Sequence, residues 1–232
     1  MKTDIKSSDY RTGVFLKVII RFILAFVFIG LLIFLPAGTI HFLNGWLFIA
    51  GLLLPMIFAL TYLITRDPEL LEKRMKLKEK EDAQKKYVLL SISLFVIAYI
   101  IPGFDYRYSW SEIPLWIVYF SLIFMLAGYI MFIAVMLQNR YASRVIEIQN
   151  QQKLIDTGLY SVVRHPMYLA ATILYLSSSL VLGSYYALIP MLFLPFLLAF
   201  RIINEEKVLI KGLPGYEEYT KKVKFRMIPY VW

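Results

Sequence analysis

The chain has no cysteine and only two histidines, His41 and His165, among its 232 residues. The absence of cysteine excludes disulfides, iron–sulfur clusters, thiolate zinc sites and a cysteine nucleophile. The two histidines fall in segments that we expect on opposite faces of a membrane, which argues against a histidine-rich metal site. We therefore predict no metal site and a reaction that needs no protein thiol.

Charge is also scarce, since 18% of the residues are charged whereas 59% are hydrophobic. This apolar share exceeds that of an average soluble domain, which is about half apolar. The formal net charge is +9, but the basic residues lie between apolar runs rather than along one patch, so the pattern does not favour nucleic-acid binding. The composition predicts an integral membrane protein that forms a single helical bundle.

Six apolar runs predict an all-α fold, a polytopic bundle of about six transmembrane helices. They cover residues 14–35, 46–64, 87–102, 113–137, 168–182 and 185–203. The first run is longer than the apolar part of a signal peptide, so we interpret it as a span. Gly183 and Ser184 alone separate the last two runs, which predicts a tight helical hairpin. Pro190 and Pro195 are expected to bend the last helix, either for packing alone or to open a cavity.

The distribution of lysine and arginine predicts the orientation of the bundle. Five of these residues lie in 1–21, eight in 66–86, four in 140–164 and seven from 201 onward, whereas Arg107 alone lies elsewhere. Because cytoplasmic loops retain positive charge, we expect both termini and the 140–164 segment in the cytoplasm. The identity of the membrane is left open.

We divide the chain at position 138, which separates the first four predicted helices and their basic cytoplasmic loop 66–86 from the C-terminal region 139–232. In the basic loop, Asp67 followed by Pro68 predicts the N-cap and first residue of a short interfacial helix. The loop either binds anionic lipid or is a solvated connector, and we assign it no chemistry.

Polar residues gather at both ends of the predicted hairpin. Arg164 and His165 precede its first helix, and Arg201 and Glu205 close its second. The hairpin returns these ends to the same depth, so His165 and Glu205 can lie close together in a pocket at the cytoplasmic interface. Alternatively, Arg201 and Glu205 form an ordinary pair four residues apart on one helix face, and His165 caps a helix.

The C-terminal region resembles the isoprenylcysteine carboxyl methyltransferase family, a relative of the phospholipid N-methyltransferases. The resemblance lies in GLYSVVRHPMY (158–168), the hydrophobic hairpin, RIINEEKVL (201–209) and GYEEYTKKVKFRMIPYVW (215–232), which follow one another in family order. It implies a cofactor-binding methyltransferase region that uses S-adenosylmethionine without a Rossmann domain. In accord with this, no Gly-rich phosphate loop follows a predicted strand.

The resemblance also implies individual residue roles. The implied cofactor contacts are Gln149, Gln152, Lys153, Leu154, Ile155, Tyr160, His165, Pro166, Met167, Tyr168 and Glu205. Those in 152–155 are expected to act mainly through backbone atoms. Arg201 matches the substrate-contacting arginine of the family.

These roles suit a methyl transfer that proceeds by positioning, without a catalytic side chain, because the methyl group of a sulfonium is already activated. A carboxylate acceptor needs no general base, but it needs a cation, and Arg201 can supply one. We expect a lipophilic acceptor, foremost an isoprenylcysteine-like carboxylate, that enters from the bilayer and meets the cofactor at the cytoplasmic face. Membrane lipids are the other expected partners.

Three alternatives are left open. The acceptor is instead a phospholipid amine or a small thiol, as in relatives of the family. An NADPH-dependent membrane reductase shares part of the C-terminal pattern. A transporter or scaffold would use the terminal charges only as interface anchors. The oligomeric state does not follow from the sequence.

Overall fold

The computed structural model describes residues 2–75, 82–141, 146 and 148–232, and every regular element within them is helical. The all-α prediction is confirmed. In chain order the elements are α1 (Lys2–Ala37), α2 (Leu43–Arg66), α3 (Pro68–Met75), α4 (Asp82–Tyr108), α5 (Leu115–Gln138), the 3-10 turn η1 (Gly158–Ser161), α6 (Pro166–Val181), α7 (Tyr185–Met191), α8 (Leu194–Gly212) and α9 (Tyr216–Lys222).

Five helical segments are long and apolar enough to cross a membrane, within the part of the chain that the structure describes. They are Ile19–Ala37, Leu43–Arg66, Lys86–Tyr108, Leu115–Gln138 and Tyr185–Gly212. The fifth predicted span is the shorter α6, whose 16 residues reach about 24 Å, less than a hydrocarbon core of about 30 Å. The chain is thus a multi-pass membrane protein of five long spans and one short apolar helix.

The third predicted span ended at Pro102, but α4 continues to Tyr108 with this proline in its interior. The continuation is held by packing and hydrogen bonds that the sequence pattern does not display. A Cβ on Gly103 would lie 2.5 Å from the carbonyl oxygen of Ile33, so α4 contacts the backbone of α1 directly. Beyond this contact, the buried carboxylate of Asp105 accepts a hydrogen bond from Ser111 N at 2.7 Å.

The predicted turn of the hairpin is confirmed, whereas its second helix is not continuous. Gly183 adopts a positive φ of 76° between α6 and α7, and Ser184 caps α7 by accepting a hydrogen bond from Ala187 N. The predicted sixth span then divides into α7 and α8, with the break between Pro190 and Pro195. Two prolines so close together each remove a backbone donor, which explains the interruption.

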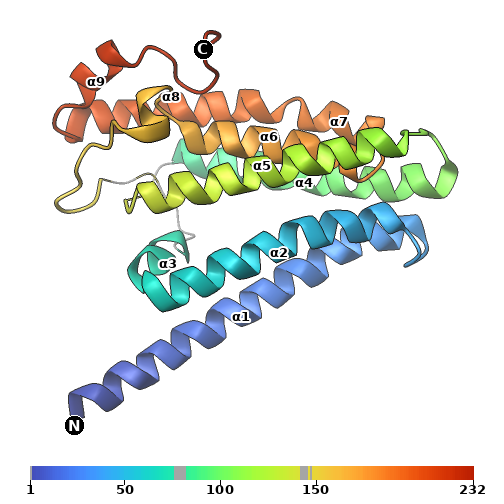
Figure 1. Cartoon of the computed structure of the whole chain (residues 1–232), viewed down its shortest axis with the longest axis horizontal. Coiled ribbons are helices and arrows are strands. Elements are labelled where there is room, and N and C mark those ends of the chain that lie inside the picture. The colour runs from blue at the N-terminus through green and yellow to red at the C-terminus, as the bar shows by residue number, and fades with distance from the viewer. Residues whose placement is uncertain (1, 76–81, 142–145, 147) are drawn as a thin grey trace.

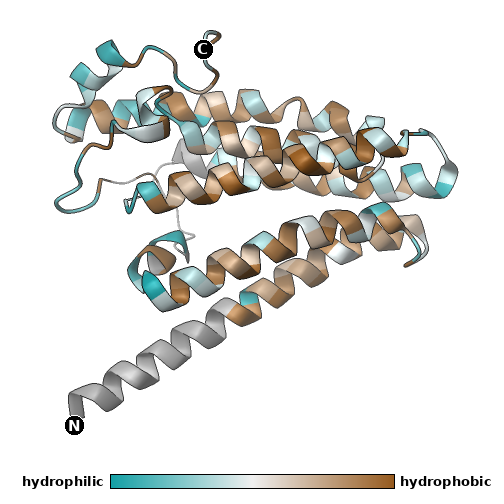
Figure 2. Cartoon of the chain, viewed as in Figure 1, coloured by the Kyte–Doolittle hydropathy of each residue, from teal (hydrophilic) through white to brown (hydrophobic). Residues whose placement is uncertain are grey.

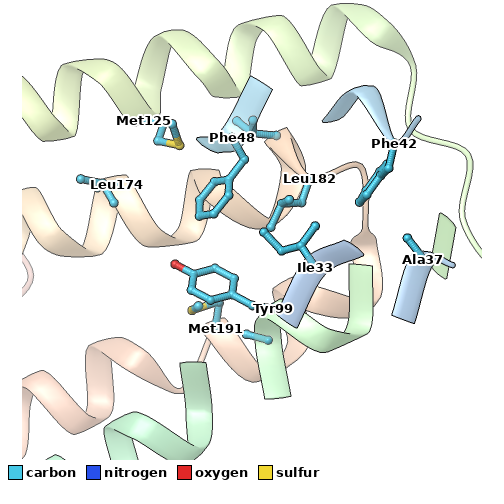
Figure 3. Close-up of a cluster of buried hydrophobic side chains, with 11 residues drawn as sticks. Ile33, Ala37, Phe42, Phe48, Tyr99, Met125, Leu174, Leu182 and Met191 are labelled. Carbon is cyan, nitrogen blue, oxygen red and sulfur yellow. The ribbon is translucent and has the colours of Figure 1, made fainter. Parts of the chain in front are cut away.

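Helices α1 and α2 lie along one side of the bundle formed by α4 to α9 (Figure 1), where α1 packs chiefly on α4 and α2 packs chiefly on α5. Hydrophobic residues make up most of the long helices (Figure 2), and many of the large ones are exposed, as expected for contact with lipid. The backbones of α5 and α6 approach closely at Gly128. A Cβ on this residue would lie 2.8 Å from Leu174 N. Figure 3 shows the main buried cluster, where Phe48, Tyr99 and Met125 meet Leu182 near the α6–α7 turn.

The short helix predicted in the basic loop is confirmed as α3, which begins at Pro68, whereas its interfacial position stays a prediction. Asp67 Oδ1 accepts a hydrogen bond from Leu70 N at 3.2 Å, as an N-cap residue does. Leu70 and Leu71 are buried in a cluster with Leu63 and Met136, so α3 packs against the end of α5. Residues 76–81 of the basic loop lie outside the described residues.

The orientation remains a prediction that single cysteines can test, because the native chain contains none. A cysteine in place of Glu112, exposed between α4 and α5, should react with an impermeant thiol reagent applied outside intact cells. A cysteine in place of Lys222, exposed at the end of α9, should react only after the membrane is permeabilised. The reverse labelling pattern would contradict the orientation deduced from loop charge.

Candidate functional site

A cavity of about 570 Å³ lies among the ends of the helices that carry the predicted site residues. Its volume falls within the usual range for small-molecule sites, about 300–1,000 Å³. Ten of the twelve predicted binding residues line it: Gln152, Lys153, Leu154, Ile155, Tyr160, His165, Met167, Tyr168, Arg201 and Glu205. The fold therefore brings together segments that lie some 50 residues apart in the sequence.

Arg201 and Glu205 meet in this cavity through the hydroxyl of Tyr168. Arg201 Nε donates to Tyr168 Oη at 3.0 Å, and Tyr168 Oη donates to Glu205 Oε2 at 2.6 Å. The guanidinium of Arg201 also lies 4.8 Å from the ring centroid of Tyr87 on α4. The tyrosine hydroxyl thus accepts from the cation and donates to the anion, which fixes both charged groups at the cavity wall.

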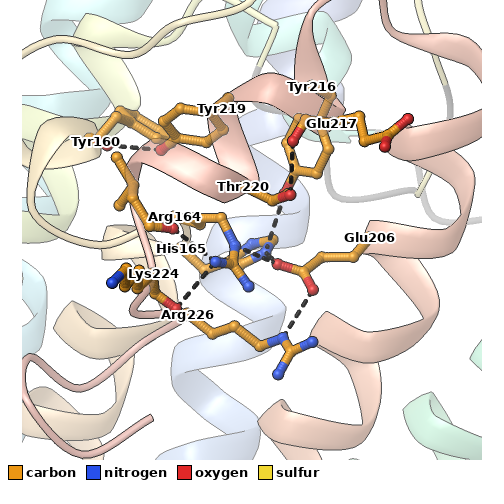
Figure 4. Close-up of polar contacts among 11 residues, drawn as sticks. Tyr160, Arg164, His165, Glu206, Tyr216, Glu217, Tyr219, Thr220, Lys224 and Arg226 are labelled. Carbon is orange, nitrogen blue, oxygen red and sulfur yellow. Dashed lines mark hydrogen bonds and ion pairs between the residues drawn. The ribbon is translucent and has the colours of Figure 1, made fainter.

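Glu206, next to Glu205, does not line the cavity and forms the centre of a buried polar network (Figure 4). Its carboxylate accepts hydrogen bonds from Arg164 Nε at 2.6 Å and from Arg226 Nε at 2.7 Å. His165 Nε2 lies 3.4 Å from the same carboxylate. Glu206 therefore joins the segment before α6 to the C-terminal tail.

The sequence predicted that His165 could lie near Glu205, but its ring faces Glu206 instead. His165 occupies the N-cap position of α6 without a side-chain capping bond, so the capping alternative is wrong for its imidazole. The ring also lies 3.5 Å from Tyr216 Oη and 5.7 Å, between centroids, from the ring of Tyr168. His165 consequently borders the cavity while Glu206 and α9 fix its orientation.

The C-terminal tail completes this wall. Arg164 N donates to Phe225 O at 2.9 Å and His165 N donates to Arg226 O at 2.7 Å, which pairs the tail with the segment before α6. The guanidinium of Arg164 reinforces the pairing through the carbonyls of Val223 and Lys224, at 2.6 and 3.0 Å. Arg164 and His165 belong to the sequence Arg164–His165–Pro166, which we call the RHP motif. These contacts show that the motif helps to hold the tail.

Tyr160, in η1, supplies a neutral hydroxyl at the edge of the predicted site. Its hydroxyl accepts a hydrogen bond from Asn139 Nδ2 at 2.9 Å, and its carbonyl accepts one from Tyr219 Oη at 2.6 Å. Burial, with repulsion from Glu205, raises the pKa of Tyr160 to about 12 against the opposing effects of Asn139 and Arg74. The phenol is therefore protonated at neutral pH and can donate to a ligand.

Two predicted cofactor contacts do not line the cavity. Gln149 turns to its own loop, where Nε2 donates to Tyr141 O at 2.7 Å and the backbone N–H donates to Gln152 Oε1 at 3.0 Å. Pro166 is the first residue of α6 and is buried. In this structure Gln149 shapes the loop and Pro166 starts the helix, and contact of either residue with the cofactor stays a prediction.

The N-terminal half contributes part of the cavity, although the sequence assigned it no chemistry. The additional lining residues are Arg74 from α3, Tyr87, Val88, Ser91, Ile92 and Phe95 from α4, and Phe132 from α5. The placement of Pro68 after Asp67 predicted the helix that carries Arg74, but nothing in the pattern indicated which of its cations faces the site.

Residues 116–214 match the family model for phospholipid methyltransferases. This segment is that of a membrane methyltransferase. We call it the methyltransferase segment; it begins in α5 and extends just beyond α8, so it contains both the RHP motif and the glutamate pair. The resemblance noted in the sequence is confirmed at the level of this group of membrane methyltransferases. No curated protein matches the chain significantly.

The match crosses the division that we placed after residue 138, since it includes most of α5. The close packing of α5 on α6 at Gly128 gives a physical reason to treat these helices as one unit. The tail that follows residue 214 lies outside the match, yet its Arg226 helps to hold Glu206. The functional division of the chain stays a prediction.

Proposed function

We propose that this membrane methyltransferase uses S-adenosylmethionine and transfers the methyl group to a lipophilic acceptor, foremost the carboxylate of an isoprenylcysteine-like molecule. The observation that carries the proposal is the chain of contacts from Arg201 through Tyr168 to Glu205 at the wall of one cavity. It offers a cation for an anionic acceptor and a carboxylate for cofactor donors at a short distance from each other.

The residues at the cytoplasmic end of the cavity fit a polar cofactor. The backbone of 152–155 provides amide donors and carbonyl acceptors, and Tyr160 provides a protonated hydroxyl. Glu205 accepts hydrogen bonds, and the rings of His165 and Tyr216 border the site. When bound, the cofactor would supply an activated methyl group. The described residues would orient it and exclude water.

Apolar residues line the part of the cavity that lies within the helices. Ile92 and Phe95 on α4, Ala171 on α6 and Leu194 and Leu198 on α8 form this region. A prenyl or acyl chain would gain hydrophobic contact there, while its polar end would reach Arg201. An in-line transfer to an ionised carboxylate requires no proton removal, so this acceptor needs no general base.

A phospholipid amine is the second candidate acceptor, and the family match favours it directly. An amine must be unprotonated to accept a methyl group, so this reaction requires a proton acceptor that the carboxylate reaction does not. Among the described residues that line the cavity, Glu205 is the one carboxylate. A phospholipid reaction would therefore need Glu205, or His165 on the same cavity wall, to accept the proton.

The proposal predicts that detergent-purified protein binds S-adenosylhomocysteine and does not bind NADPH. Calorimetric titration with each compound measures this directly. A methyl-labelled cofactor supplied with N-acetyl-S-farnesylcysteine or with phosphatidylethanolamine then identifies the acceptor by the labelled product. Binding of NADPH alone would favour a reductase, and binding of neither compound would contradict the proposed cofactor.

A further inference from the structure

Arg74 reaches the cavity from outside the methyltransferase segment. It lies on α3, and its guanidinium carbon is 5.3 Å from the ring centroid of Phe132 on α5. Its charge also acts on the phenol of Tyr160, whose pKa it lowers against the stronger effect of burial. Arg74 therefore lies between the apolar part of the cavity and the segment predicted to bind the cofactor.

Contacts with Arg140, which lies just after α5, fix the position of α3. Arg140, just after α5, donates through Nε to Asp67 Oδ2 at 3.0 Å, and its NH2 group lies 2.9 Å from the same oxygen. Lys73 Nζ donates to the carbonyl of Arg140 at 3.4 Å. Together with the buried Leu70 and Leu71, these contacts hold Arg74 at the cavity before any ligand arrives.

The charges of the lining residues favour an anionic ligand. Among the described lining residues, Arg74, Lys153, Arg164 and Arg201 are cationic, whereas Glu205 alone is a carboxylate. Arg164 forms an ion pair with Glu206, which does not line the cavity. Guanidinium and ammonium groups donate charged hydrogen bonds, and they therefore suit a ligand with a carboxylate or phosphate.

The positions of Arg74 and Arg201 relative to the helix ends favour contact with the acceptor rather than with the cofactor. Arg74 stacks on Phe132, six residues or about 9 Å before the end of α5. Arg201 lies well inside α8, eleven residues before its end at Gly212. The predicted cofactor segment 152–155 lies instead in the loop outside the apolar helices. Both guanidinium groups thus contact aromatic rings on the helical part of the cavity wall, Phe132 for Arg74 and Tyr87 for Arg201.

We propose that Arg74 binds the anionic group of the methyl acceptor and, together with Arg201, makes the site selective for anionic lipids. This inference rests on the proposed function. It assigns a recognition role to α3, so that acceptor choice depends on a helix that precedes the methyltransferase segment in the chain. A guanidinium that stacks on an aromatic ring is well suited to paired hydrogen bonds with a carboxylate or phosphate.

The test compares wild type with Arg74→Gln in the presence of saturating S-adenosylhomocysteine. The probes are N-acetyl-S-farnesylcysteine, its neutral carboxamide and a short-chain phosphatidylglycerol, each titrated by calorimetry in the same detergent. We expect Arg74→Gln to bind at least one anionic probe about tenfold more weakly or worse, and to bind the carboxamide as wild type does. Arg74→Lys should restore part of the lost affinity, because it restores charge without the planar fork.

Arg66→Gln is the matched control, since Arg66 is an exposed arginine at the end of α2, two residues before α3, and does not line the cavity. It should leave all three affinities unchanged, and thermal unfolding should show that each variant keeps its fold. Three outcomes would overturn the inference: equal probe affinities for wild type and Arg74→Gln, failure of wild type to bind either anionic probe, or a selective loss of S-adenosylhomocysteine affinity in Arg74→Gln. If wild type does not bind S-adenosylhomocysteine at all, the proposed function itself fails.

Discussion

Arg201→Ala is expected to lower kcat/KM for an isoprenylcysteine carboxylate by roughly 30-fold or more while S-adenosylhomocysteine affinity stays close to that of wild type. Truncation of one partner in a buried, hydrogen-bonded charge pair costs about 2 kcal/mol or more, which sets this magnitude. Arg201 is buried at the cavity wall, where Tyr87 and Tyr168 orient its guanidinium. An acceptor carboxylate would lose its cation in the variant.

Glu205→Gln should show the opposite pattern. Loss of a charged hydrogen bond is worth about 1.5–3 kcal/mol, so S-adenosylhomocysteine affinity should fall by roughly 10- to 150-fold. Lys207→Gln provides the control, because Lys207 is exposed on the same helix and does not line the cavity. Steady-state kinetics and calorimetry measure the two effects separately.

Tyr168 couples the two residues, and a double-mutant cycle can expose this coupling. Tyr168→Phe removes the hydroxyl that accepts from Arg201 and donates to Glu205. Its effect on each single variant gives the interaction energy that the hydroxyl transmits. If Arg201→Ala and Glu205→Gln weaken cofactor binding equally, and the double variant adds nothing, the separate role of Arg201 in acceptor binding is wrong.

Glu206→Ala is expected to destabilise the protein more than any single change within the cavity. The variant leaves Arg164 buried without the carboxylate that now neutralises it, and Arg226 loses the same partner. Breaking a buried ion pair by removing one partner costs about 3–5 kcal/mol. For a chain of this size, that corresponds to a fall in Tm on the order of 10 °C. Thermal unfolding in detergent, followed by circular dichroism, measures it.

Comparison with the neighbouring glutamate makes this prediction specific. Glu205→Gln should keep a near-native Tm, because Glu205 lines the cavity and does not contact Arg164 or Arg226 in the described network. Glu206→Gln should fall between wild type and Glu206→Ala, since an amide oxygen still accepts one hydrogen bond. A native Tm in Glu206→Ala, with a loss of cofactor affinity equal to that of Glu205→Gln, would make Glu206 a ligand contact instead.

Local signals in the sequence were sufficient for the helices and for the general place of the site. The apolar runs predicted the membrane helices, because lipid requires long stretches of apolar side chains around a hydrogen-bonded backbone. Asp67 and Pro68 predicted α3, and Gly183 with Ser184 predicted the hairpin turn. The charged residues that flank the hairpin indicated the end of the bundle where the cavity lies.

The direction in which each charged side chain points could not be predicted in the same way. Successive residues on an α-helix differ by about 100° around its axis, so Glu205 and Glu206 must face different surroundings. Which of them faces the cavity depends on the rotation of α8, and this is set by its packing against α4 and α6 and by the tail that brings Arg226 to Glu206. The pairing of His165 with Glu206 rather than Glu205 follows from that rotation.

The sequence by itself determined that this chain is a helical membrane protein with a polar site at one end of a C-terminal hairpin. The tertiary structure alone decided that Arg74 and Tyr87 share the cavity with Arg201, because these residues come together only when α3 and α4 pack against α5 and α8. Contacts between distant segments leave no periodic pattern in the sequence. The division of the glutamate pair into one cavity residue and one buried anchor is likewise a product of packing.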